Sequence, residues 1–233
     1  PINTSSLGNL SALGTESTDD KIMAFSPGFD SLFMVNKGET RWYLANSFEP
    51  TSDDGCHYRM TLNEGMTWHD GEPITADDVI FTVQALQEPT NGFSTGPVMY
   101  SGDPVVVEKV DDLTVDVSIS KPYSGMASLF GRIKIAPAHV FGNDIHVTEN
   151  QEALMSGIGS GPFKVKEFKE GEYLIYERYD DYYRGKASLD EVIIKMMPEE
   201  STQEVALQNG ELSMMRISNQ EKLEKYSNDE EYE

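Results

Sequence analysis

The sequence contains a single cysteine, Cys56, among its 233 residues. A lone cysteine cannot form a disulfide within the chain, and no Cys-x-x-Cys or paired Cys/His pattern indicates a zinc site. No run of about 18 apolar residues is present, so no segment has the length and composition of a membrane-spanning helix. The first residues, from Pro1, lack the basic and apolar regions of a signal peptide. Composition alone therefore leaves the compartment open.

Basic residues are also scarce. The chain has 18 lysines and arginines against 40 aspartates and glutamates, which gives a formal net charge of -22. Such a surface repels phosphate backbones and anionic lipid, so we expect no nucleic-acid partner. The hydrophobic content of 38% and aromatic content of 10% are those of a globular protein.

Catalytic and metal-site patterns are missing as well. The sequence has no G-x-S-x-G, S-x-x-K or H-E-x-x-H motif, and no two histidines have helical metal-ligand spacing. The glycine-rich run 157–162 is followed by a predicted hairpin, whereas a phosphate loop needs a helix there. His69 lies beside Asp70 in a predicted turn, where we expect a local hydrogen bond. We predict no enzyme activity, catalytic residue, metal or cofactor.

The most strongly patterned stretch runs from Tyr58 to Leu86. Its first residues alternate between apolar and polar, which predicts a half-buried strand over 58–62, and Met66–Trp68 reads as a second extended segment. Thr75 and Asp78 form a variant of the capping box at the start of a helix that continues to Leu86.

The remainder of the chain predicts further short elements. Residues 21–35 suggest a short helix before Pro27-Gly28, and residues 88–102 a long loop. Alternating residues predict hairpins over 105–119 and 163–177. Ser201 and Glu204 form a second capping box, and Gly210 is placed to end that helix.

Two stretches resemble a known family. The segment with the centre WHDGEPITADDV is similar to the signature of the peptide/nickel (family 5) solute-binding proteins of ABC transporters. The run that begins GIGSGPFKV and reaches Leu212 resembles the second signature of that family, with Tyr183 where the family has tryptophan. The resemblance covers nearly the whole chain, whereas the chain covers about the first half of a family member and so resembles the N-terminal lobe only.

The resemblance implies a mixed α/β fold, the first lobe of a periplasmic-binding-protein-type fold with an inserted β-rich subdomain. The implied divisions are 1–50 (start of lobe I), 51–155 (inserted subdomain) and 156–233 (continuation of lobe I, ending before lobe II). The implied function is extracytoplasmic capture of oligopeptides or a similar small solute between two lobes, for delivery to ABC permease subunits. The protein would be monomeric and a cell-surface lipoprotein or periplasmic. With one lobe, we expect weak or no binding.

By alignment with the family, three regions of this lobe contact ligand. The residues implied are Thr15, Glu16, Ser17, Thr18, Phe93, Met99, Phe130 and Arg132. Arg132 would bind a ligand carboxylate with two hydrogen bonds, and an ordinary surface arginine is the alternative. The stretch around Trp68 and His69 would instead build the scaffold.

A different class of protein also accounts for part of the pattern. A free-standing β-rich interaction or carbohydrate-binding module would explain the hairpins and would leave the aromatic residues Tyr182 and Tyr183 exposed. The length of the parent reading frame separates this alternative from the transporter hypothesis.

Overall fold

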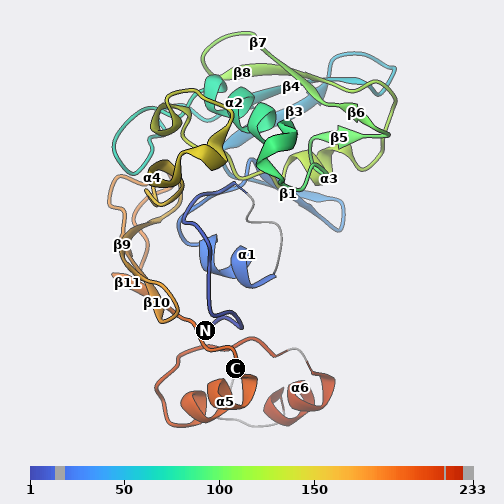
Figure 1. Cartoon of the computed structure of the whole chain (residues 1–233). Helices are drawn as coiled ribbons and strands as arrows, with labels where there is room; N and C mark the ends of the chain where they lie inside the picture. The colour runs from blue at the N-terminus through green and yellow to red at the C-terminus, as the bar shows by residue number, and fades with distance from the viewer. Residues whose placement is uncertain (14–18, 218, 228–233) are drawn as a thin grey trace.

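The computed structural model describes residues 1–13, 19–217 and 219–227. Its strands form two larger antiparallel sheets and two small hairpins, and its helices lie around them (Figure 1). No helix in the described part of the chain is long and apolar enough to cross a membrane.

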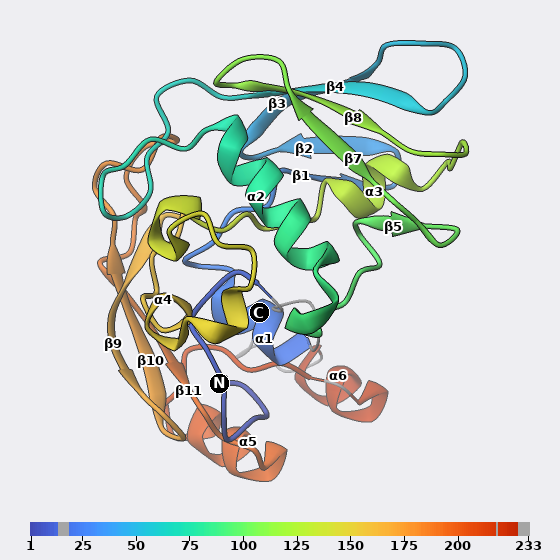
Figure 2. The same cartoon turned by 45° about the horizontal axis from the view of Figure 1, so that its top comes forward.

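The larger sheet has the strand order β3-β4-β8-β7, and its strands are Ala45–Pro50, His57–Leu62, Thr114–Ser118 and Val106–Lys109. The predicted strand at 58–62 and the hairpin at 105–119 are therefore confirmed. Helix α2 (Ala76–Gln87) packs along this sheet (Figure 2), and Val79 and Val83 share one core with Met60 and Val115. Met66–Trp68 is paired through one isolated bridge, from Thr67 to Pro73, so the segment is extended as predicted but does not form a regular strand.

Helix α2 begins as its sequence predicts. The Asp78 carboxylate accepts the backbone N–H of Thr75 at 2.9 Å, which completes the capping box. The other oxygen of Asp78 accepts the backbone N–H of Ala138 at 2.9 Å, at the start of the 3-10 helix η3 (Ala138–Phe141). One buried carboxylate thus fixes both the helix start and a segment 60 residues away.

The second sheet has the order β11-β10-β9, from Glu191–Lys195, Tyr173–Arg178 and Phe163–Lys169. This confirms the predicted hairpin at 163–177. Its core contains Phe25 of helix α1 (Asp19–Phe25), together with Leu174 and Tyr176, while Ile2 adds a parallel bridge to Met196. A short helix was predicted in this first region, and α1 confirms it.

The hairpin of β1 (Phe33–Asn36) and β2 (Glu39–Trp42) joins the larger sheet to the site described below. Phe33 is buried and Trp42 packs against the larger core, whereas Met34 is 44% exposed. Because successive strand residues point to opposite faces, the hairpin has one core face and one open face.

The remaining elements are short. They are η2 (Pro89–Asn91), β5 (Met99–Tyr100), β6 (Asp103–Pro104), α3 (Met126–Phe130), η4 (Val147–Glu149), α4 (Gln151–Leu154), α5 (Glu200–Gln208) and α6 (Gln220–Ser227). Helices α5 and α6 lie beyond the three-stranded sheet (Figure 1).

The start of α5 differs from its prediction. Helix α5 follows Glu199, and no side chain caps it, so the capping box at Ser201 is wrong. The helix starts before Ser201, which therefore lies within its first turn. Gly210 follows the helix with a φ of 73°, in agreement with its predicted role at the helix end. The division of the chain at residues 50 and 155 stays a prediction; strand β3 of the larger sheet precedes residue 51.

Candidate functional site

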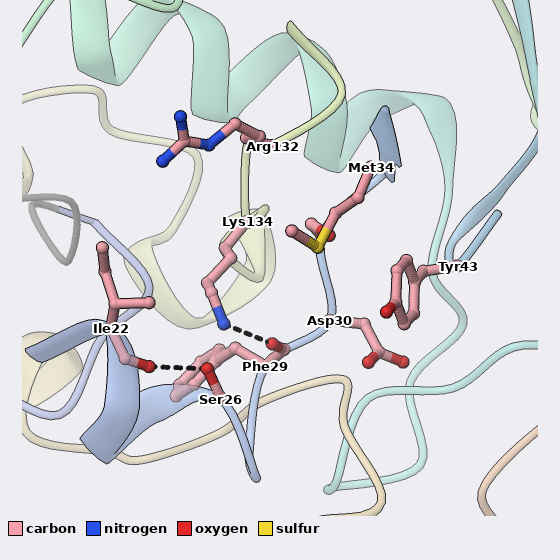
Figure 3. Close-up of a pocket in the computed structure, with 9 residues that line it drawn as sticks. Ile22, Ser26, Phe29, Asp30, Met34, Tyr43, Arg132 and Lys134 are labelled. Carbon is pink, nitrogen blue, oxygen red and sulfur yellow. Dashed lines mark hydrogen bonds between the residues drawn. The ribbon is translucent and has the colours of Figure 1, made fainter. Parts of the chain in front are cut away.

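A pocket of about 190 Å³ lies between α1, the β1–β2 hairpin and the segment after α3 (Figure 3). The segment 131–134 runs beside residues 31–33, with backbone hydrogen bonds from Leu32 to Ile133 and from Phe33 to Gly131. Ile133 is buried in the core, so the residues on either side of it, Arg132 and Lys134, point to the opposite face. The pairing of these segments is what brings the two cations to the pocket.

The cations have different surroundings. Lys134 donates from Nζ to the backbone oxygen of Phe29 at 2.7 Å, a contact drawn in Figure 3. Arg132 is exposed and forms no ion pair with any carboxylate in the described residues. A guanidinium without a protein partner can offer two parallel N–H donors to a ligand carboxylate.

Asp30 lines the pocket and is 7% exposed. Its Oδ2 atom accepts hydrogen bonds from the hydroxyls of Tyr182 at 2.7 Å and Tyr183 at 3.0 Å. Burial raises the pKa of Asp30, and the hydrogen bonds from the two tyrosines only partly oppose that rise. The two rings are half-buried, so the exposed aromatic pair expected for a free-standing module is wrong.

The tyrosine pair gives a testable prediction. Replacing both Tyr182 and Tyr183 by phenylalanine removes two donors from a buried carboxylate. We expect the free energy of unfolding to fall by about 1–3 kcal/mol and the pKa of Asp30 to rise further. Urea unfolding and carboxyl NMR titration measure the two effects. Tyr173→Phe is the control, because the Tyr173 hydroxyl donates to Glu167 at the surface; an equal loss there would contradict the prediction.

The sequence-predicted site residues fall into three groups. Arg132 lines the pocket. Phe93 and Met99 are partly buried, each packed against a hydrophobic core, and Phe130 is completely buried and stacked on Phe48. Thr15, Glu16, Ser17 and Thr18 lie outside the described residues. The structure adds Asp30, Met34, Tyr43 and Lys134 to the pocket. Of these four residues, only Lys134 was predictable from the sequence, because polar and apolar residues alternate around Ile133.

The first signature stretch, around His69, is part of the scaffold between the two sheets. His69 Nδ1 accepts the backbone N–H of Gly159 at 3.0 Å, and Nε2 lies 3.0 Å from the backbone oxygen of Gly161. The expected local hydrogen bond is therefore wrong, because the partners are about 90 residues away. The neighbouring Asp70 instead pairs with His139 at 2.8 Å. An acceptor Nδ1 requires the neutral imidazole, and burial lowers the pKa of His69 to about 4.

The glycines opposite His69 have a packing role. A Cβ atom on Gly159 would lie 2.0 Å from the backbone oxygen of Gly28, and one on Gly161 would lie 2.6 Å from that of Pro27. Only glycine permits this approach. The glycine-rich run is thus a junction with the segment that ends in Asp30, in agreement with the expectation that it is not a phosphate loop.

The described residues contain no group of three or more histidine, cysteine, aspartate or glutamate side chains placed to hold a metal ion. What the pocket offers is an exposed guanidinium, an ammonium, a buried carboxylate and the apolar surfaces of Met34 and Tyr43. This combination is suited to reversible recognition of a polar solute.

Comparison with known proteins places the chain in a class. Residues 40–233 match the family described as bacterial extracellular solute-binding proteins, family 5 Middle. The chain belongs to this family of solute-binding proteins, and its mixed α/β architecture is that of the periplasmic-binding-protein fold, as predicted.

Particular relatives agree with this assignment. The chain is 33% identical to the oligopeptide-binding protein AppA of Bacillus subtilis over 184 residues, which is 76% of this chain and 33% of that protein. The crystal structure of that AppA with a nonapeptide is 30% identical, with a TM-score of 0.76 over 87% of this chain and 40% of its own. The ABC transporter substrate-binding protein CtaP of Listeria monocytogenes is 31% identical, with a TM-score of 0.81 over 97% and 45%. The chain thus spans less than half the length of these relatives.

Proposed function

We propose that this chain forms one lobe of an extracytoplasmic peptide-binding protein that delivers oligopeptides to an ABC permease. The relative crystallised with a nonapeptide is the observation that carries this proposal, because it shares 30% identity and the fold with 87% of this chain. Capture between two lobes and a monomeric state follow from the same resemblance. In agreement with that function, we propose that the protein is either a lipoprotein at the cell surface or a resident of the periplasm.

Within the described residues, the pocket with Arg132 and Lys134 is the proposed ligand-contacting surface of this lobe. Arg132 is assigned to a peptide carboxylate because it is exposed and forms no ion pair with any acidic side chain that the structure describes. Phe93, Met99 and Phe130 do not line this pocket, and their proposed contact with ligand rests on the family resemblance. A peptide would favour the closed arrangement of two lobes by its greater affinity for that state.

The test is calorimetric titration of the complete product of the gene with an uncharged-side-chain nonapeptide, as the free acid and as the C-terminal amide. We expect Arg132→Gln to weaken binding of the free acid by about 10- to 100-fold, the range for hydrogen bonds between charged groups. Binding of the amide should change little, because the carboxylate that Arg132 would contact is absent.

The control variant is Lys121→Gln, which removes an equal charge from an exposed residue outside the pocket. No binding of either peptide by the wild-type protein would contradict the proposed function. Equal weakening of the acid and the amide would contradict the role of Arg132 alone. A reading frame that ends at Glu233 would favour the free-standing module.

A further inference from the structure

Two further hollows share lining residues with the pocket in Figure 3, and Tyr43 lines all three. The second hollow follows the open face of the β1–β2 hairpin, and the third lies between Tyr43 and Tyr183. Met34 lines both the first and the second. We call these three hollows around Tyr43, taken together, the Tyr43 groove.

The pairing of the hairpin fixes which side chains reach the groove. Met34 is opposite Arg41 in the β1–β2 register, while the adjacent pair, Phe33 and Trp42, faces the core. Paired residues lie on the same face of two antiparallel strands, so Arg41 joins Met34 on the open side. At the third hollow, the Arg184 guanidinium lies over the ring of Tyr43, with its carbon 5.3 Å from the ring centroid.

Cations are concentrated along the Tyr43 groove although the chain as a whole has a net charge of -22. The groove is lined by the basic residues Lys37, Arg41, Arg132, Lys134 and Arg184, and by the acidic residues Asp30, Glu39 and Glu64. Basic residues therefore outnumber acidic ones here, the reverse of the whole chain. One of the three carboxylates, that of Asp30, already accepts two tyrosine hydroxyls.

Ion pairs with carboxylates are rarer among these cations than among the cations elsewhere. Most lysines and arginines outside the groove pair with a carboxylate, namely Arg59, Lys109, Lys164, Lys166, Lys169, Arg178, Lys186, Arg216 and Lys222. In the groove, Lys37, Arg41, Arg132 and Arg184 form no such pair with any described residue. The groove thus carries a local excess of positive charge in a protein that is acidic overall.

We infer that the Tyr43 groove selects peptides that carry carboxylate side chains. The inference rests on the proposed peptide-binding function and adds its substrate class. Unpaired guanidinium and ammonium groups along the groove can form ion pairs with aspartate or glutamate side chains of a bound peptide without first breaking an ion pair within the protein. The ring of Tyr43 and the thioether of Met34 supply the apolar surface between these charges.

The test is calorimetric titration of the complete gene product with three nonapeptides of matched length, rich in glutamate, glutamine or lysine. The glutamate peptide should bind most tightly. Raising the ionic strength from about 0.01 to about 0.1 M shortens the screening length from about 30 to about 10 Å, so the advantage of the glutamate peptide over the glutamine peptide should shrink. Arg41→Gln and Arg184→Gln should each lower the affinity for the glutamate peptide by about two- to fivefold, the effect of losing an exposed ion pair.

Lys121→Gln serves as the charge-matched control outside the groove and should leave the preference unchanged. Glutamine and glutamate peptides of equal affinity would overturn the inference while leaving peptide binding intact. The inference would also be overturned if Lys121→Gln reduced the preference for the glutamate peptide as much as Arg41→Gln does. The net charge of the protein, and not the groove, would then set the preference. Failure of all three peptides to bind would overturn the proposed function as well.

Discussion

Replacing Trp68 by alanine is expected to lower the free energy of unfolding by about 3–5 kcal/mol, the cost of removing a buried aromatic side chain from a core. Trp68 is completely buried, and it is among the largest fully buried side chains in the protein. It packs in the same core as Val79 of α2 and Met60 of β4. Truncation would leave a cavity where the larger sheet meets α2.

Urea unfolding of Trp68→Ala measures this loss. Leu189→Ala is the control, because Leu189 is 61% exposed and its truncation should change stability by less than about 0.5 kcal/mol. A Trp68→Ala protein that keeps its stability but loses peptide affinity would contradict the scaffold role and assign Trp68 to the ligand.

Acidification is expected to destabilise the protein through His69. The pKa of His69 is about 4 in the folded protein against an ordinary value of 6.5. The unfolded chain therefore binds a proton at His69 more readily between these two pH values. The contribution of His69 to the free energy of unfolding is complete above about pH 6.5 and is lost as the pH falls towards 4. Its full size is about 3 kcal/mol, because each pKa unit corresponds to about 1.4 kcal/mol.

Other groups change stability in the same pH range, so the His69 contribution must be isolated. Burial raises the pKa of Asp30 and of Asp78, and the folded state therefore binds protons at these carboxyls more readily than the unfolded chain. They add stability as the pH falls, with the opposite sign to His69. The difference between wild type and His69→Gln, measured by urea unfolding at several pH values, removes their contribution.

We expect the wild type to lose more stability than His69→Gln between pH 6.5 and 4. His146→Gln is the control, because the His146 pKa is raised by its hydrogen bond with Asp144, so that its contribution is lost as the pH rises. Parallel pH profiles for wild type and His69→Gln would contradict the assignment of acid sensitivity to this imidazole.

Local patterns predicted the elements well where the cause was local. Alternation of apolar and polar residues predicted the hairpins at 105–119 and 163–177, and the capping pair Thr75 and Asp78 predicted the start of α2. The capping box at Ser201 failed because helix α5 already begins after Glu199. The candidate site was predicted less completely: Arg132 lies in the pocket, whereas Asp30, Met34 and Tyr43 reach it only through the packing of distant segments.

The sequence by itself determined the family resemblance, the mixed α/β class, the acidic charge and the positions of most hairpins, because these depend on residue order and short-range spacing. Only the tertiary structure decided the partners of His69 and Asp30, which lie about 90 and about 150 residues away. It also decided which of the basic residues with described side chains are paired and which line the Tyr43 groove. Hydrogen bonds and ion pairs across such separations depend on how the sheets and segments dock, and no local pattern of residues specifies that docking.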